Sequence, residues 1–120
     1  MAPDAVIKRY KREAIEAYKA IYISIVGGIG WAGNYTRPDL AYTYGKFSRY
    51  VSNPGLLYFN ALYYFLRYVK YTVDLEMIYR SRDGEDTLLI YSDTDFAGCL
   101  NTKRSTGDYF IFKNDNLISW

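Results

Sequence analysis

Two aspartates in the segment Tyr91–Gly98, which reads Y-S-D-T-D-F-A-G, have the clearest potential for chemistry. Asp93 stands where an apolar run ends, and Asp95 would share its face if a strand continued. Carboxylates at a strand end can hold Mg²⁺, which prefers oxygen ligands in octahedral geometry. Two-metal hydrolysis of a phosphodiester, however, needs several carboxylates around both ions. By residue type alone, these acids therefore also fit a solvated loop.

Other kinds of chemistry are excluded by composition. The 120 residues include no histidine and a single cysteine, Cys99. A disulfide within the chain, a Ser–His or Cys–His nucleophile and a zinc site of histidine and paired cysteines are therefore ruled out. Carboxylate, lysine, tyrosine and hard-metal chemistry remain.

A second group of candidates lies near residue 70. The basic residues Arg67 and Lys70 are interleaved with Tyr68 and Tyr71. Guanidinium and ammonium groups can bind phosphates while aromatic rings stack on bases, a combination typical of nucleic-acid binders. The same residues would also suit a solvated helix end.

Charge is unevenly distributed along the chain. Up to Arg80 there are eleven lysines and arginines against six acids, and from Ser81 onward four against seven. Lys103 and Arg104 form a weaker basic pair within this acidic part. A basic part followed by an acidic part would suit polyanion contact beside a metal site, and ordinary solvated charge gives the same pattern.

The glycines Gly28, Gly30 and Gly33 match G-x-G-x-x-G. A dinucleotide-binding motif must open a helix and be followed by an acidic residue for the ribose, and neither condition holds here. We therefore predict close helix packing or a loop for these glycines.

Helices are predicted before residue 74. Residues 4–19 fit an exposed helix, and 21–25 fit either a strand or a helix whose buried stripe includes Ile21, Ile25 and Ile29. Thr36-Arg37-Pro38-Asp39 predicts a capping box. The spacing of Leu40, Tyr44, Phe47 and Val51 then gives one face of a helix ended by Asn53-Pro54-Gly55. A third helix is predicted over 56–71, with Phe59, Leu62, Phe65, Leu66 and Val69 on its apolar face.

Strands are predicted after residue 74. Residues 75–79 and 87–92 flank Asp83-Gly84, which predicts a hairpin. Residues 108–113 and 117–120 form a second predicted pair, in which Phe110 and Phe112 would face one side of a strand covered on both faces. The edge after Trp120 would be open. The fold class is thus α+β, a helical bundle followed by an incomplete antiparallel sheet.

Location is predicted from the apolar runs. Residues 1–19 are charged, with no apolar signal segment, and the run 20–32 is shorter than the roughly 20 residues of a membrane span. We therefore expect an intracellular chain, cytoplasmic or nuclear, that is not secreted, does not contact a membrane and has no disulfide partner.

Five stretches carry a family resemblance. Thr36–Tyr42 reads T-R-P-D-L-A-Y, Leu66–Thr72 reads L-R-Y-V-K-Y-T, and Tyr91–Gly98 was given above. Arg104–Thr106 (R-S-T) and Leu117–Trp120 (L-I-S-W) follow. In this order and spacing they resemble the T-R-P-D-I-A-Y, L-R-Y-L-K-G-T, Y-S-D-A-D-W-A-G, R-S-T and I-S-W motifs of copia-type retrotransposon Pol polyproteins.

The resemblance implies two regions with different ancestry. Residues 1–74 would correspond to the thumb and connection of a reverse transcriptase, which grip primer–template or RNA–DNA hybrid. Residues 75–120 would be the opening strands of a ribonuclease H-like domain. Asp93 would be the first metal-binding carboxylate of that domain, which holds Mg²⁺ in the parent enzyme, whereas Asp95 would not be a core ligand.

The function implied is that of a Pol fragment without catalysis. The polymerase's paired aspartates (Y-x-D-D) and the remaining ribonuclease H carboxylates have no counterpart in this sequence, so we expect the chain to bind no metal ion. One alternative is a residual nucleic-acid-binding module that uses Arg67, Lys70, Lys103 and Arg104. Another is a protein-interaction fragment that pairs through the open sheet edge. Departures from the family pattern suggest a decaying genomic copy; they occur at Tyr58, Tyr71, Cys99 and Gly107-Asp108.

Overall fold

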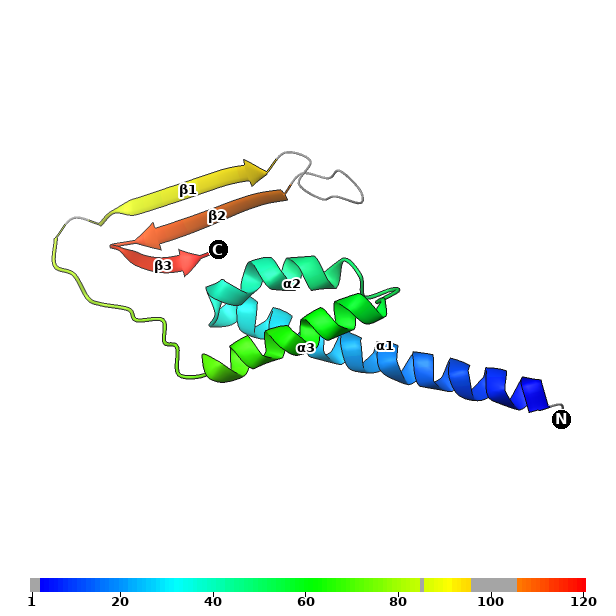
Figure 1. The fold of residues 1–120 in the computed structure, drawn as a ribbon. Helices are drawn as coiled ribbons and strands as arrows, with labels where there is room; N and C mark the ends of the chain where they lie inside the picture. The colour runs from blue at the N-terminus through cyan, green and yellow to red at the C-terminus, as the bar shows by residue number, and fades with distance from the viewer. Residues whose placement is uncertain (1–2, 85, 96–105) are drawn as a thin grey trace. The chain divides into compact units, whose positions relative to one another are not determined.

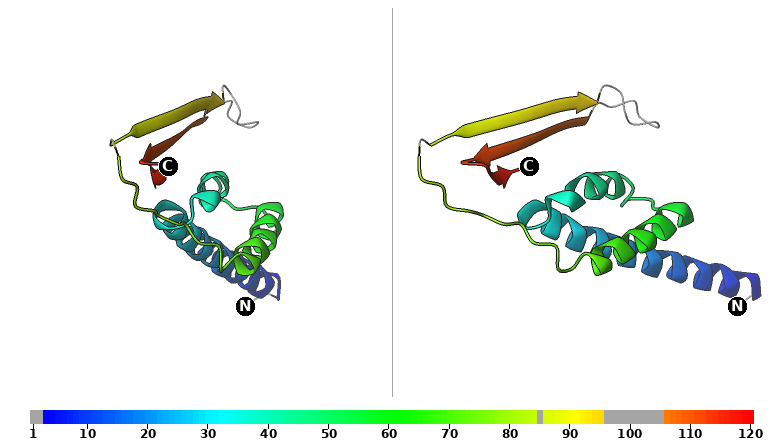
Figure 2. Two further views of the ribbon diagram at one scale, coloured as in Figure 1. Left: turned by 90° about the vertical axis from the view of Figure 1, so that its left-hand side faces the viewer. Right: turned by 60° about the vertical axis from the view of Figure 1, so that its left-hand side comes forward.

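The computed structural model describes residues 3–84, 86–95 and 106–120. The chain divides into two compact units, Met1–Leu75 and Glu76–Trp120. The first is helical and the second holds the strands (Figures 1 and 2). The α+β class, with helices followed by an open antiparallel sheet, is confirmed.

The first helix, α1 (Pro3–Tyr35), runs without a break through the segment that the sequence left ambiguous. The strand alternative for residues 21–25 is therefore wrong. The predicted isoleucine stripe is also wrong in part, because Ile21 is 52% exposed. The buried face belongs instead to Tyr22, Val26 and Ile29, at spacings of four and three residues.

The glycines of α1 include two points of close approach. A Cβ added to Gly30 would lie 2.4 Å from the ring of Tyr44, and one added to Gly33 would lie 3.4 Å from the backbone nitrogen of Ala41. Without side chains, these glycines let the helix approach the segment that follows it. The prediction of close helix packing is confirmed for Gly30 and Gly33, whereas a Cβ added to Gly28 would have nothing within 4 Å.

Three further helical elements complete the first unit: η1 (Pro38–Leu40), α2 (Ala41–Ser48) and α3 (Leu56–Tyr71). The third predicted helix is confirmed at both ends. The second ends earlier than expected, at Ser48, and backbone bonds from Tyr50 to Phe47 and from Asn53 to Tyr50 continue it as turns. Leu40, Phe47 and Leu62 join the α1 face in the core, and partly buried side chains of α3 pack around them.

The prediction of a capping box at Thr36 is wrong. The Thr36 hydroxyl lies 3.4 Å from the carbonyl oxygen of Ala32, to which it donates, and so closes the end of α1. The N-cap of η1 is Arg37, and no side chain caps it. The threonine therefore ends one helix and does not begin the next.

The second unit contains β1 (Leu88–Asp95), β2 (Thr106–Lys113) and β3 (Asn116–Ser119) in the antiparallel order β1-β2-β3. Lys113 pairs with Asn116, so Asn114 and Asp115 alone form the turn. Both have positive φ, 49° and 62°. Such angles define a type I′ turn, whose twist matches that of the strands.

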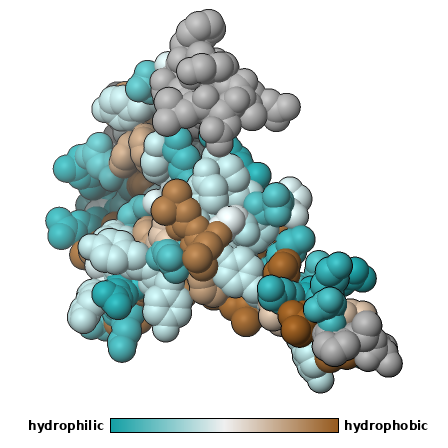
Figure 3. All heavy atoms as spheres, turned by 45° about the vertical axis from the view of Figure 1, so that its right-hand side comes forward, coloured by the Kyte–Doolittle hydropathy of each residue, from teal (hydrophilic) through white to brown (hydrophobic). Residues whose placement is uncertain are grey.

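Two predictions about the sheet are wrong. Residues 75–79 form no strand, and β1 pairs with β2 rather than with that segment. Neither face of β2 is fully covered, since Tyr109 is 47% exposed and Phe110 44%. Outside the sheet, apolar side chains also reach the surface, and Leu57, for example, is 77% exposed. Figure 3 shows hydrophobic residues, in brown, on one face of the molecule.

Candidate nucleic-acid interface

The exposed side of α3 gathers the basic and aromatic residues predicted to bind nucleic acid. Helical spacing places Tyr63, Tyr64, Arg67, Lys70 and Tyr71 within one third of the helix circumference. All five are exposed, with Tyr64 at 74% and Tyr71 at 85%. We call these five residues the α3 outer face.

Charge on this face is entirely positive. The sequence of α3 contains no aspartate or glutamate. Within the described part of the chain, no hydrogen bond or ion pair involves the side chain of Arg67 or Lys70. Two available cations beside three exposed rings can bind phosphates and stack on bases.

Tyr68, which the sequence placed with these residues, has a different role. Its hydroxyl donates to Oδ2 of Asp39 over 2.8 Å, and its ring stacks on Phe65 at 5.6 Å. Tyr68 therefore belongs to the internal contacts of the helical unit. Tyr63 and Tyr64 are the rings that replace it on the outer face, and their helical spacing from Arg67 and Lys70 could have identified them.

The contacts around Tyr68 form a cluster that the sequence interpretation missed. The Arg37 guanidinium donates to both oxygens of Asp39, at 2.9 and 2.8 Å. It also donates to the carbonyl oxygen and the hydroxyl of Thr72, at 2.9 and 2.7 Å. We call Arg37, Asp39, Tyr68 and Thr72 the Arg37 clamp. Because Thr72 is the C-cap of α3, the clamp places a cation at the negative end of that helix.

The pKa values of the clamp follow from these bonds. The hydrogen bond from Arg37 lowers the pKa of the Asp39 carboxyl, although partial burial opposes this shift. The hydrogen bond that Tyr68 donates to Asp39 raises the pKa of the Tyr68 hydroxyl. The hydrogen bonds that Arg37 donates to Asp39 raise the pKa of the Arg37 guanidinium. Asp39 is therefore ionised, and Tyr68 and Arg37 are protonated, across the neutral range.

Asp93, the candidate metal ligand, lies within β1. Its side chain is exposed, and its Oδ1 accepts a hydrogen bond from the backbone of Thr94 over 2.8 Å. Its partner across the sheet is Asp108. Among the residues described, no group of three or more acids or cysteines could hold a metal ion. Lys103 and Arg104, the other predicted contacts, lie outside the described residues.

A hydrogen-bonded loop beside β3 is the second feature that sequence reasoning missed. Tyr79 donates its hydroxyl to the carbonyl oxygen of Leu117 over 2.7 Å. The Asn116 amide accepts from the backbone nitrogen of Arg80 over 2.8 Å and donates to its carbonyl oxygen over 2.9 Å. The partners are 38 residues apart in the first contact and 36 in the second, so no local pattern could have indicated either.

Comparison with known proteins finds relatives that match most of the chain. The chain is 37% identical to secreted RxLR effector protein 161 of Plasmopara viticola over 82% of its own length and 69% of that protein. It is 34% identical to the retrovirus-related Pol polyprotein from transposon TNT 1-94 of Nicotiana tabacum, over 85% of the chain and 8% of the polyprotein. It is also 35% identical to the uncharacterized mitochondrial protein AtMg00810 of Arabidopsis thaliana, over 81% of the chain and 40% of that protein.

Most of the chain is homologous to a short part of a retrotransposon polyprotein. The chain is a distant homologue of the copia-type Pol polyproteins, which confirms the resemblance carried by the five motifs. No protein-family model and no solved structure matches it. No helix within the described ranges is long and apolar enough to cross a membrane.

Proposed function

We propose that this chain is a non-catalytic piece of a copia-type Pol polyprotein that binds nucleic acid through the α3 outer face. In this assignment the helical unit derives from the end of the reverse-transcriptase region and the strands from the start of the ribonuclease H domain. The observation that carries it is the match to Pol polyproteins over 82–85% of the chain. The exposed Arg67 and Lys70, flanked by tyrosines, supply the surface for binding.

The acids described here do not fit the Mg²⁺ centre of a two-metal nuclease. Such a centre surrounds both ions with several carboxylates. Asp93 and Asp108 are cross-strand neighbours, and no third acid joins them among the described residues. We therefore derive no hydrolytic step, and we propose that Asp93 is a vestige of the first ribonuclease H carboxylate.

Catalysis is tested on an RNA–DNA hybrid in the presence of Mg²⁺. We expect no cleavage by the purified chain, with circular dichroism used to verify its helices and strands. Asp93→Asn is the matched variant, because it removes the candidate ligand without changing the size of the side chain. Cleavage by the chain that this substitution abolishes would contradict the proposal.

Binding is tested by fluorescence anisotropy with single-stranded DNA and with an RNA–DNA hybrid at several salt concentrations. Replacing Arg67 and Lys70 together by glutamine should weaken binding and reduce the slope of log affinity against log salt by about 1.4 on a single strand, since each phosphate contact there contributes about 0.7. The control replaces Lys8 and Arg12 by glutamine, which removes the same charge from exposed positions of α1. Equal losses in both variants would show attraction to net charge alone.

The aromatic component of the outer face is tested separately. Tyr71→Ala should cost about 1–3 kcal/mol of binding to a single strand, the range measured for stacking of a base on an aromatic side chain. Because Tyr71 is 85% exposed, this change should leave the free energy of unfolding unchanged. Full retention of single-strand affinity would remove Tyr71 from the interface.

A second function, self-association through the sheet edge, is favoured by β1. Within the described sheet, β1 pairs with β2 only, and its Leu88 and Ile90 are 63% and 61% exposed. An exposed apolar edge strand can pair with a second copy of the same strand. Sedimentation should then show a dimer that Ile90→Lys dissociates, and a monomer at every concentration would exclude this function.

A further inference from the structure

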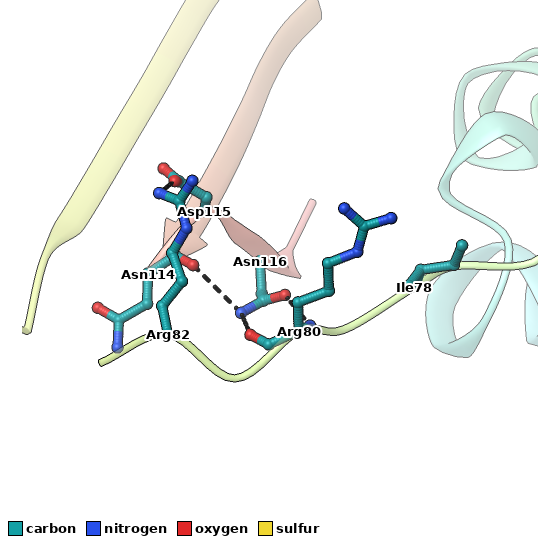
Figure 4. Close-up of a pocket in the computed structure, with 6 residues that line it drawn as sticks. All are labelled: Ile78, Arg80, Arg82, Asn114, Asp115 and Asn116. Carbon is teal, nitrogen blue, oxygen red and sulfur yellow. Dashed lines mark hydrogen bonds and ion pairs between the residues drawn. The ribbon is translucent and has the colours of Figure 1, made fainter. Parts of the chain in front are cut away.

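A small pocket lies beside the β2–β3 turn, wholly within the second unit. Its volume is about 330 Å³, and it is lined by Ile78, Arg80, Arg82, Asn114, Asp115 and Asn116 (Figure 4). This volume falls at the lower end of the range for small-ligand sites. The Pol assignment gives no role to these residues.

The walls of the pocket are held by backbone and amide contacts. The Asn116 amide fixes the backbone of Arg80 through two hydrogen bonds, at 2.8 and 2.9 Å. The Asn114 amide accepts from the backbone nitrogen of Thr87 over 2.8 Å and donates to Asp86 over 3.1 Å. Both asparagines therefore use their side chains to connect the segment before β1 to the turn. The position of Arg80 does not depend on its own side chain.

The two guanidinium groups of the pocket differ in their partners. Arg82 forms an ion pair with Asp115. In Figure 4 no dashed line reaches the Arg80 guanidinium, and no hydrogen bond or ion pair of that group occurs within the described residues. Two arginines against one aspartate leave the lining with a net positive charge.

We propose that this pocket binds a phosphate group, with Arg80 as its principal ligand and Arg82 as the second. A planar guanidinium donates two parallel hydrogen bonds to phosphate oxygens, a geometry that lysine cannot provide. Arg82 and Asp115 are 67% and 63% exposed, so their ion pair is weak and Arg82 can turn to a phosphate at little cost. Ile78 adds an apolar surface beside the charged groups. Where the phosphate belongs to a nucleic-acid strand, the proposal rests on the nucleic-acid function proposed above.

The test is an NMR titration of the full chain, first with inorganic phosphate and then with a short oligothymidylate. The side-chain amide of Asn116 and the backbone amide of Arg80 report on the pocket directly. We expect saturable shifts of both signals, which Arg80→Gln should weaken about tenfold or more. Arg80→Lys should restore them only in part, because the charge returns without the two-pronged donor.

Lys113→Gln provides the matched control. It removes one positive charge from β2, next to the turn but outside the lining of the pocket. Because Asn116 holds Arg80 through backbone atoms, Arg80→Gln should keep the native chemical shift of the Asn116 amide, which verifies the fold.

Each outcome decides between the alternatives. Shifts with both probes would support a strand-phosphate site, and shifts with inorganic phosphate alone would support a site for free phosphate. No saturable shift with either probe, or an equal loss in Arg80→Gln and Lys113→Gln, would overturn the pocket proposal. Binding to DNA lost in the Arg67/Lys70 variant while the phosphate response remains would separate a failure of the α3 outer face from a failure of the pocket.

Discussion

Replacing Arg37 by alanine removes four hydrogen bonds from the helical unit, two to Asp39 and two to Thr72. Exposed ion pairs couple by about 0.2–1 kcal/mol, whereas breaking a fully buried pair costs about 3–5 kcal/mol. The Arg37 and Asp39 side chains are 12% and 26% exposed, so they lie between these limits. We expect a coupling free energy of about 1.5–2.5 kcal/mol. This is a large share of the roughly 4–11 kcal/mol with which a unit of this size unfolds.

The assay is a double-mutant cycle in the full chain. Arg37→Ala, Asp39→Ala and the double variant are unfolded with urea and followed by far-ultraviolet circular dichroism, which reports the helices. The control cycle uses Arg9 and Glu13, an ion pair in the same helical unit whose side chains are 69% and 55% exposed. For that pair we expect a coupling of about 0.3–0.5 kcal/mol.

Comparing the two cycles shows whether the Arg37 clamp stabilises the helical unit more than an exposed ion pair does. A coupling between Arg37 and Asp39 no larger than that between Arg9 and Glu13 would refute the clamp as a stabilising element. Thr72→Val offers a further check, because it removes one acceptor of Arg37 and keeps the other, the backbone carbonyl. Its cost should be smaller than that of Arg37→Ala.

Three further predictions follow from the same unit. Arg37 lowers the pKa of the Asp39 carboxyl in the folded chain. The ionised carboxylate therefore stabilises the fold above its pKa in the unfolded chain, about 3.9, and this contribution is lost as the pH falls through the lower pKa of the folded chain. The difference in unfolding free energy between the natural chain and Asp39→Asn should accordingly shrink below about pH 4. Leu62→Ala should cost about 2–5 kcal/mol in urea unfolding, because Leu62 is 1% exposed, whereas Leu57→Ala, at a position 77% exposed, should stay within about 0.5 kcal/mol. Gly30→Ala should destabilise the chain, because the added Cβ would overlap the ring of Tyr44. Gly27→Ala, whose added Cβ has nothing within 4 Å, should stabilise the chain by up to about 1 kcal/mol. Equal thermal midpoints for the two variants would contradict the packing described.

The helices could be predicted from the sequence where a periodic apolar face meets clear end signals. The third helix is the best example, because Pro54-Gly55 precedes it and its apolar residues recur every three to four positions. The capping box failed because a threonine hydroxyl can donate as well as accept. The Thr36 hydroxyl donates to the carbonyl oxygen of Ala32 in the preceding helix, and only the three-dimensional structure shows that it caps the end of α1.

The sheet was predictable only in part, because both residues 75–79 and β2 were suitable antiparallel partners for β1. The second predicted pair, 108–113 with 117–120, is confirmed as the β2–β3 hairpin. The hairpin around Asp83-Gly84 had a similar local pattern, but β1 found its partner in β2 instead. The segment before β1 bonds to Asn116 through the backbone of Arg80, a contact between residues far apart in sequence. Such pairing depends on the whole sheet and leaves no local signal.

Two of the five family motifs meet in the Arg37 clamp, and this separates residues that maintain the fold from residues that could bind a partner. Arg37 and Asp39 come from T-R-P-D-L-A-Y, whereas Tyr68 and Thr72 come from L-R-Y-V-K-Y-T. These four residues hydrogen-bond to one another within the helical unit, and these contacts explain why they occur together. Arg67 and Lys70 lie in the second motif but point outward and make no such contact within the described residues. Contacts within the helical unit therefore account for Arg37 and Asp39 of the first motif and for Tyr68 and Thr72 of the second. Such contacts do not account for the two outward cations, and binding of a polyanionic strand is the explanation that we propose for them.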